Sequence, residues 1–275
     1  SESDREQCLF QTSLRVECLA GEFLPPMPAT KSFDAEEEEI RFRYRHRIHW
    51  ASGHGCSGNW GSYEKDSSPH WLAMVFMPHA EVQPFDGDPR PGSEFDTRIL
   101  KPDFLSQIQD PSELRSLLES FSSDFGEWLT EQESCAGSRL QKDPFTRILS
   151  RLREQHQRLK AGIDFLCDES RPEIREAFCI ANEAMLLQME KTALIKGRDF
   201  DRKEVRWYPF QLAFQLLTIP GIVDKSADSG RDIVDLLWFP TGGGKTEAYL
   251  LLAAFTIIYR RKVYGDRGGG TALFS

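Results

Sequence analysis

The sequence predicts an α/β fold, in which an accessory α+β domain over residues 1–200 precedes the start of a P-loop domain over residues 201–275. Three observations predict it. Apolar residues between about 41 and 77 follow strand patterns, those between about 103 and 197 follow helical spacing, and residues 233–264 run as strand, glycine-rich loop and helix. We expect the second domain to be truncated, because only the opening of its strand–helix–strand unit is present.

Composition places the chain among globular proteins and restricts its partners. Hydrophobic residues make up 40% and charged residues 28% of the 275 residues, so the chain can form a core. The net charge of −9 argues against non-specific coating of nucleic acid, so a DNA contact should come from local basic stretches. No leader pattern and no apolar run of roughly 20 residues is visible, so we expect a cytoplasmic protein without a membrane partner. The six cysteines form no C-x-x-C pair, which indicates reduced thiols.

Besides a short possible strand at Leu14–Leu19, two strands are predicted in the first domain. From Arg41 to Trp50, arginines alternate with aromatic and aliphatic residues, which is typical of a half-buried strand. Trp71 to Met77 is continuously apolar, as in a strand buried on both faces, and the Gly- and Ser-rich residues 52–62 predict a loop between the two. The arginine face could follow a nucleic-acid backbone, but the acidic run Glu36–Glu39 could pair with it instead.

Four side chains near this loop could in principle hold zinc: His46, His49, His54 and Cys56. Their spacing fits no common zinc finger, and no second ligand pair is nearby in the sequence. We therefore expect them to serve the loop and the core.

The helical part of the first domain carries several capping signals. Asp110-Pro111 offers an N-cap followed by a proline at the first helical position. Residues 144–166 place apolar side chains at helical spacing. Ser170 begins a capping-box pattern for a further helix, which we expect to end near Gly197.

The second domain has a different order of elements. Pro209–Thr218 predicts a short helix that Pro220 closes, and Ile233–Phe239 predicts a buried strand. Thr246–Tyr264 predicts an apolar helix, and Thr271–Phe274 resembles the opening of another strand. Strand, loop, helix and strand in this order begin a βαβ unit.

The strongest functional signal is a P-loop between that strand and that helix, with the sequence Phe239-Pro240-Thr241-Gly242-Gly243-Gly244-Lys245-Thr246. Glycines let backbone N–H groups converge on phosphate oxygens, a lysine places its charge at the β- and γ-phosphates, and the hydroxyl that follows can bind Mg²⁺. The pattern predicts ATP and Mg²⁺ as cofactors, with Lys245 and Thr246 as catalytic residues and Thr246 as the magnesium ligand. The other predicted cofactor-binding residues here are Thr241, Gly242, Gly243, Gly244 and Glu247.

The form of this P-loop is similar to motif I of superfamily 2 helicases, although Phe239 stands where the general pattern has a small residue. Those motors read adenine with an upstream glutamine, and the segment Arg206-Trp207-Tyr208-Pro209-Phe210-Gln211 resembles that element. The resemblance assigns Gln211 to adenine, since a side-chain amide can both donate and accept a hydrogen bond. The alternative is a glutamine that caps a helix beside packed aromatic residues.

Residues 206–261 resemble the helicase-like subunit of the DISARM anti-phage system, the DrmA family. Two stretches carry the resemblance, Pro209–Phe214 and Asp235–Tyr249, and Phe178–Gln188 and Gly53–Cys56 are also similar. It implies a RecA-like second domain, a bacterial protein, ATP-dependent binding of DNA that is single-stranded or has single-stranded ends, and a partner subunit in a defence complex. It also implies that the Walker B pair and the arginine finger lie beyond Ser275, so this chain alone should bind nucleotide poorly and hydrolyse nothing.

Three hypotheses about function follow. The first is a fragment of an ATP-dependent DNA helicase or translocase in anti-phage defence. The second is a P-loop ATPase that acts as a nucleotide switch and controls assembly without DNA translocation. In the third, residues 1–200 form a partner-binding scaffold to which the P-loop domain is appended.

Overall fold

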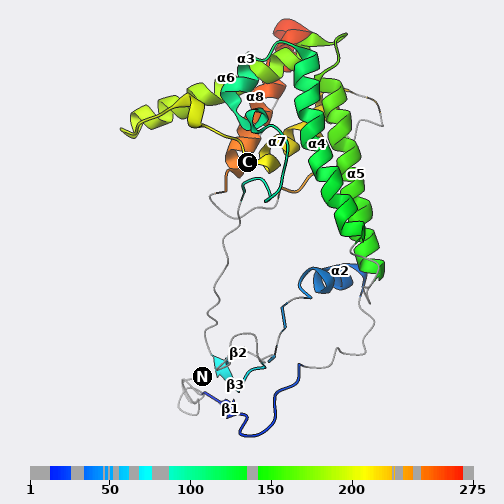
Figure 1. The fold of residues 1–275 in the computed structure, drawn as a ribbon. Coiled ribbons are helices and arrows are strands. Elements are labelled where there is room, and N and C mark those ends of the chain that lie inside the picture. Colours follow the sequence, from blue (N-terminus) through cyan, green and yellow to red (C-terminus); the bar gives the residue numbers. More distant parts are fainter. Residues whose placement is uncertain are drawn as a thin grey trace, which may run out of the picture. The chain divides into compact units, whose positions relative to one another are not determined.

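The computed structural model describes residues 13–25, 34–45, 47–48, 50–51, 56–61, 68–75, 87–134, 142–224, 226, 232–237 and 243–268 (Figure 1). The chain forms two compact units. The sheet unit comprises residues 1–84 and 143–145, and the helical unit comprises residues 85–142 and 146–275. The predicted domain boundary at residue 200 stays a prediction.

The sheet unit contains a small antiparallel sheet in the order β1-β3-β2. Its strands are β1 (Arg15–Glu17), β2 (Ser57–Gly61) and β3 (Trp71–Val75), and Leu72 of the central strand pairs with a residue of each neighbour. The predicted strand at 71–77 is therefore confirmed over residues 71–75, although its side chains are half-buried. The predicted loop over residues 52–62 is wrong for residues 57–61, which form β2.

The predicted strand over residues 41–50 is also wrong, because α2 (Ala35–Arg43) occupies its first part and the described residues of the rest form no strand. The side chain of Asp34 caps this helix by accepting a hydrogen bond of 2.8 Å from the backbone N–H of Glu37. Glutamates fill the first turn and arginines the last, and both charges suit the helix dipole. Only one apolar side chain of the alternating pattern, Phe42, is buried among the residues described there.

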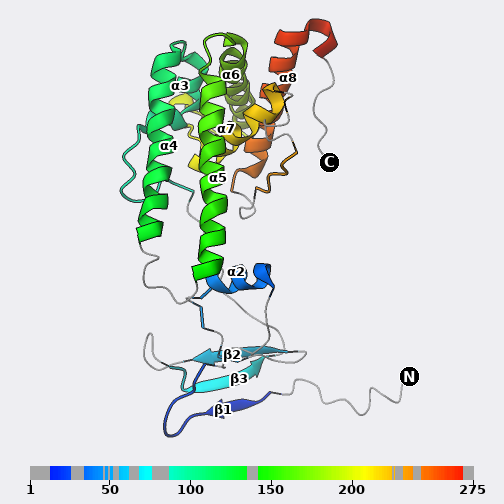
Figure 2. The same ribbon diagram turned by 90° about the vertical axis from the view of Figure 1, so that its right-hand side faces the viewer.

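The helical unit consists of six α-helices and short 3₁₀ turns over its described residues (Figures 1 and 2). The α-helices are α3 (Pro102–Gln107), α4 (Pro111–Ser134), α5 (Lys142–Leu166), α6 (Pro172–Ile195), α7 (Pro209–Val223) and α8 (Lys245–Tyr264). The 3₁₀ turns are Thr97–Leu100, Arg202–Glu204 and Gly265–Gly268. The long helices α4 and α5 lie side by side, and α6 packs against α3 and α8. None of the described helices is long and apolar enough to cross a membrane.

The helices predicted for this part of the chain are confirmed, with small changes at their ends. Asp110 accepts a hydrogen bond from the N–H of Ser112 at the start of α4. Gly197 has a positive φ of 61° just after α6, as expected for a helix that ends there. The capping role predicted for Ser170 is wrong, because its hydroxyl donates to Asp168 and Arg171 occupies the N-cap position.

The predicted α/β fold class, with a RecA-like second domain, is wrong. Of the described residues, 65% are helical and 6% lie in strands, all of them in the sheet unit. The predicted strand at Ile233–Phe239 is not formed at its described residues, 233–237, where Val234 is 93% and Leu236 is 86% exposed. A strand buried on both faces needs neighbouring strands, and the described residues of the helical unit include none. The strand predicted at 271–274 lies outside the described residues.

Helix α7 continues beyond its predicted end at Thr218 and passes through Pro220 to Val223. A proline inside a helix leaves the carbonyl four residues earlier without its usual partner, and that carbonyl here belongs to Leu216. The Leu216 carbonyl packs against Gly162 of α5 so closely that a Cβ at position 162 would lie 1.9 Å from its oxygen. Glycine at position 162 therefore lets α5 approach the backbone of α7 closely at this carbonyl.

Candidate functional site

The N-terminus of α8 carries the end of the P-loop motif. Gly244 is the N-cap residue of α8, and its φ of 84° lies in the left-handed region that favours glycine. A Cβ at this position would also lie 2.6 Å from the side-chain nitrogen of Gln211. The backbone conformation therefore favours glycine here, and a Cβ would displace the Gln211 amide.

Gln211, the predicted adenine-binding residue, is buried beside that glycine. Its Nε2 donates a hydrogen bond of 2.7 Å to the carbonyl of Gly244, and its Oε1 accepts one of 2.8 Å from the backbone N–H of Tyr208. The second bond caps the start of α7, next to the stacked rings of Tyr208 and Phe210. The capping role considered for Gln211 is thus observed, and its contact with adenine stays a prediction.

A second glutamine, which the sequence analysis missed, repeats this contact one helical turn later. Gln215 is fully buried, and its Nε2 donates a hydrogen bond of 2.8 Å to the carbonyl of Ala248. Gln211 to Gly244 and Gln215 to Ala248 are both separations of 33 residues, so the two bonds fix the register of α7 against α8. The available signal was the spacing of four residues between two glutamines on an otherwise apolar helix.

The segment before α7 is held by buried polar contacts that place Gln211. Trp207 is buried, its backbone N–H donates to the carbonyl of Leu100 at 2.7 Å, and its indole N–H donates to the side-chain oxygen of Asn182 at 2.8 Å. The amide nitrogen of Asn182 in turn donates to the carbonyl of Phe178 within α6. The start of α7 is therefore attached to α6 and to the turn that precedes α3.

The remaining predicted site residues divide into those that the structure describes and those that it does not. Gly243, Lys245 and Glu247 are half-buried, and Thr246 is exposed in the first turn of α8. Thr241 and Gly242 lie outside the described residues. The backbone N–H groups and dipole at the start of a 20-residue helix attract anions, so this terminus suits a phosphate group. The exposed hydroxyl of Thr246 suits a magnesium ion that accompanies such a phosphate.

The described residues contain no group of three or more histidine, cysteine, aspartate and glutamate side chains arranged to hold a metal ion. Of the four zinc candidates, His46, His49 and His54 lie outside the described residues, and Cys56 is half-buried just before β2.

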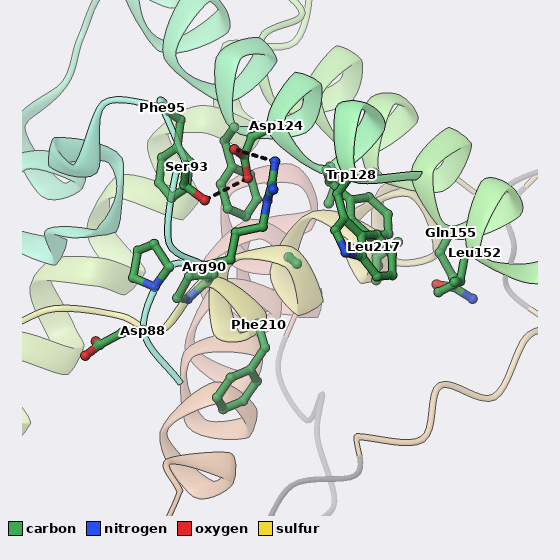
Figure 3. Close-up of a pocket in the computed structure, with 16 residues that line it drawn as sticks. Asp88, Arg90, Ser93, Phe95, Asp124, Trp128, Leu152, Gln155, Phe210 and Leu217 are labelled. Carbon is green, nitrogen blue, oxygen red and sulfur yellow. Dashed lines mark hydrogen bonds and ion pairs between the residues drawn. The ribbon is translucent and has the colours of Figure 1, made fainter. Parts of the chain in front are cut away.

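A cavity of about 510 Å³ lies between α4, α5 and the start of α7 (Figure 3). Pro209 and Phe210 line it, so the first turn of α7 contacts the P-loop through Gln211 and the cavity through these two residues. Most of its wall is apolar, and five aromatic residues contribute to it: Phe95, Phe121, Phe125, Trp128 and Phe210. Its size and lining are those of a small-molecule pocket.

Three of the polar and charged side chains that line this cavity form a small hydrogen-bonded group, marked by dashed lines in Figure 3. Asp124 accepts a hydrogen bond of 3.1 Å from the hydroxyl of Ser93 and lies 3.6 Å from the guanidinium of Arg90. Arg90 also contacts Glu131 at 3.4 Å. These contacts attach the segment before α3 to α4, and the sequence analysis did not find this cavity.

One similarity to a known protein bears on this site. Over 251 residues the chain is 32% identical to the DISARM protein DrmA of Bacillus paralicheniformis (strain ATCC 9945a / NCIMB 11709 / CD-2), a match that covers 84% of this chain. The resemblance predicted from the sequence motifs is therefore confirmed, and it extends over most of the chain. The chain spans 22% of the length of that relative. No protein-family model matches the chain.

Proposed function

We propose that this chain is the nucleotide-binding part of an ATP-dependent motor that acts on DNA in a DISARM-type anti-phage defence system. The observation that carries the proposal is the P-loop sequence at the start of α8, with Gln211 hydrogen-bonded to its last glycine. The similarity to a DISARM protein supports the defence role.

In this proposal the chain contributes ATP binding rather than complete hydrolysis. Lys245 holds the phosphates, Thr246 holds Mg²⁺, and Thr241, Gly242, Gly243, Gly244 and Glu247 shape the surrounding cradle. Gln211 reads adenine. Its Nε2 already donates to Gly244 and its Oε1 already accepts from Tyr208, so reading the base uses the second N–H and the second lone pair of the same amide.

The proposed partners are DNA with single-stranded regions and a second protein subunit of the defence complex, in the cytoplasm. The net charge of −9 supports a localised DNA contact over a diffuse one, since an acidic surface repels the phosphate backbone.

The test is ATP turnover by the full-length protein, with and without single-stranded DNA. Lys245→Ala is the test variant, and Lys262→Ala is the matched control, since Lys262 lies at the other end of the same helix and pairs with Glu176. We expect turnover that rises with DNA, is lost in Lys245→Ala and is retained in Lys262→Ala. Turnover that depends on the lysine but does not change with DNA would support a nucleotide switch instead. Absence of turnover would refute the proposed ATPase activity.

A further inference from the structure

An ion pair joins α5 to the segment that leads into the P-loop. Arg158 of α5 donates from Nη1 to Oδ1 of Asp235 and from Nη2 to Oδ2, each at 2.7 Å. The two side chains are only 17% and 21% exposed. A bidentate arginine–carboxylate pair fixes orientation as well as distance, and partial burial strengthens it by excluding water.

The same guanidinium also contacts α7. Arg158 Nη2 donates to the carbonyl of Leu217 at 3.3 Å, and Nη1 donates to Oε1 of Gln155 on its own helix at 3.2 Å. One side chain therefore connects α5, α7 and the segment 232–237. Helix α7 is also the element that supplies Gln211 and Gln215 to α8.

Asp235 attaches the described residues 232–237, which lead into the P-loop, to Arg158 of α5. It precedes Lys245 by ten residues. Its neighbours Val234 and Leu236 are almost fully exposed, so within the described residues 232–237 their side chains provide little packing. On its other side the P-loop is fixed through α8 by the two glutamines.

We propose that Arg158 and Asp235 are positioning residues for the P-loop. They hold the chain that enters the loop, while Gln211 and Gln215 hold the helix that leaves it. Each attachment limits the conformations of the described residues on its side, 232–237 and the start of α8, and a preorganised site binds with a smaller entropic cost. The role in nucleotide binding rests on the proposed function, and the attachment of the segment does not.

Hydrogen exchange by mass spectrometry, without nucleotide, tests the attachment. The variants are Asp235→Asn, which removes the charge, and Arg158→Lys, which removes the paired donors. The matched control is Asp164→Asn, which breaks the pair of Arg115 with Asp164, also 2.7 Å long and also on α5 but distant in sequence from the P-loop. We expect exchange in the described residues 232–237 to become faster in the two test variants and to stay unchanged in the control. Unchanged exchange in the test variants would overturn the proposal.

Steady-state ATP turnover by the full-length protein tests the consequence for nucleotide binding. Loss of positioning raises KM for ATP, by about tenfold on the scale of couplings between contacting groups, and leaves kcat near wild type. A purely structural role would lower the active fraction and therefore kcat, without changing KM, and that result would overturn the positioning role. If wild-type protein shows no turnover, the proposed function fails, and the exchange experiment still decides whether the pair anchors the segment.

Discussion

The two units of this chain differ in how they bury their side chains. In the helical unit, residues from the 3₁₀ turn at Thr97–Leu100 through α8 share one core, in which Ile99, Leu114, Phe178 and Phe255 are fully buried. In the sheet unit, the described residues of all three strands are half-buried or exposed. The helical unit is therefore stabilised by packing that its sequence supplies, whereas the sheet relies on backbone pairing between short strands.

This difference indicates where substitutions should matter. A close-packed core responds to the addition or loss of a single methyl group, and an exposed three-residue strand does not. Five predictions test that contrast, from the largest expected effect to the smallest.

Gly162→Ala should destabilise the helical unit by about 3 kcal/mol, because the new Cβ would meet the backbone carbonyl of Leu216, which cannot rotate away. Within a helix the same change ordinarily stabilises by about 1 kcal/mol. Gly126→Ala in α4 is the matched control, since its Cβ would meet the side chain of His156, which can move. Denaturant unfolding measures both, and equal stability of the two variants would contradict the packing described here.

The rate of thiol labelling should differ between the cysteines of the two units. Burial raises the pKa of Cys167 and of Cys179 to about 11, from a usual value of 9.0. At pH 8 iodoacetamide should therefore label them roughly hundredfold more slowly in folded than in urea-unfolded protein, because only the thiolate reacts. Half-buried Cys56 of the sheet unit should be labelled earlier.

The same two cysteines also predict a pH dependence. A raised pKa means that the folded state holds the thiol proton more tightly than the unfolded state does. Their contribution to stability is therefore present below about pH 9 and is lost as the pH rises towards 11. Thermal unfolding from pH 8 to 11 checks this, and a replacement of both residues by alanine should flatten that decline.

Asn182→Ala should lower the free energy of unfolding by about 2 kcal/mol, because it leaves the buried indole N–H of Trp207 without its acceptor. Gln188→Ala on the exposed side of the same helix should change the free energy of unfolding by less than about 0.5 kcal/mol. If the two variants proved equally stable, the attachment of the α7 start to α6 would not contribute as described.

Val16→Thr in β1 should have the smallest effect on the free energy of unfolding, below about 0.5 kcal/mol, because Val16 is 46% exposed. The identical substitution at buried Val223 of α7 should lower the free energy of unfolding by about 1–2 kcal/mol, since it places a hydroxyl in the core. A larger loss at Val16 than at Val223 would show that the sheet depends on packing and would reverse the comparison.

The sequence was most informative where local signals and tertiary packing agree. Asp110-Pro111, the apolar spacing of 144–166 and the glycine at 197 predicted helix positions that the structure confirms. The helix after the P-loop begins at Lys245, one residue before its predicted start. Caps and helical periodicity act within a few residues of the chain, so they can be identified without knowledge of the fold.

Short-range patterns were misleading where two structures satisfy them. The arginine alternation after residue 40 fits a strand, but a capped run of glutamates followed by arginines also stabilises a helix, and the helix α2 forms. The apolar run after residue 232 fits a buried strand, but burial requires partner strands, and Val234 and Leu236 remain exposed among the described residues of the helical unit.

By itself the sequence determined the confirmed helices and the resemblance to DrmA, and it predicts the P-loop, because each depends on residues that are close together in the chain. Only the tertiary structure decided that Gln211 and Gln215 bond to α8 across 33 residues, that Arg158 meets Asp235 across 77, and that Gly162 admits the Leu216 carbonyl. The physical reason is that such contacts depend on how the helices pack against one another, which no local pattern of side chains specifies.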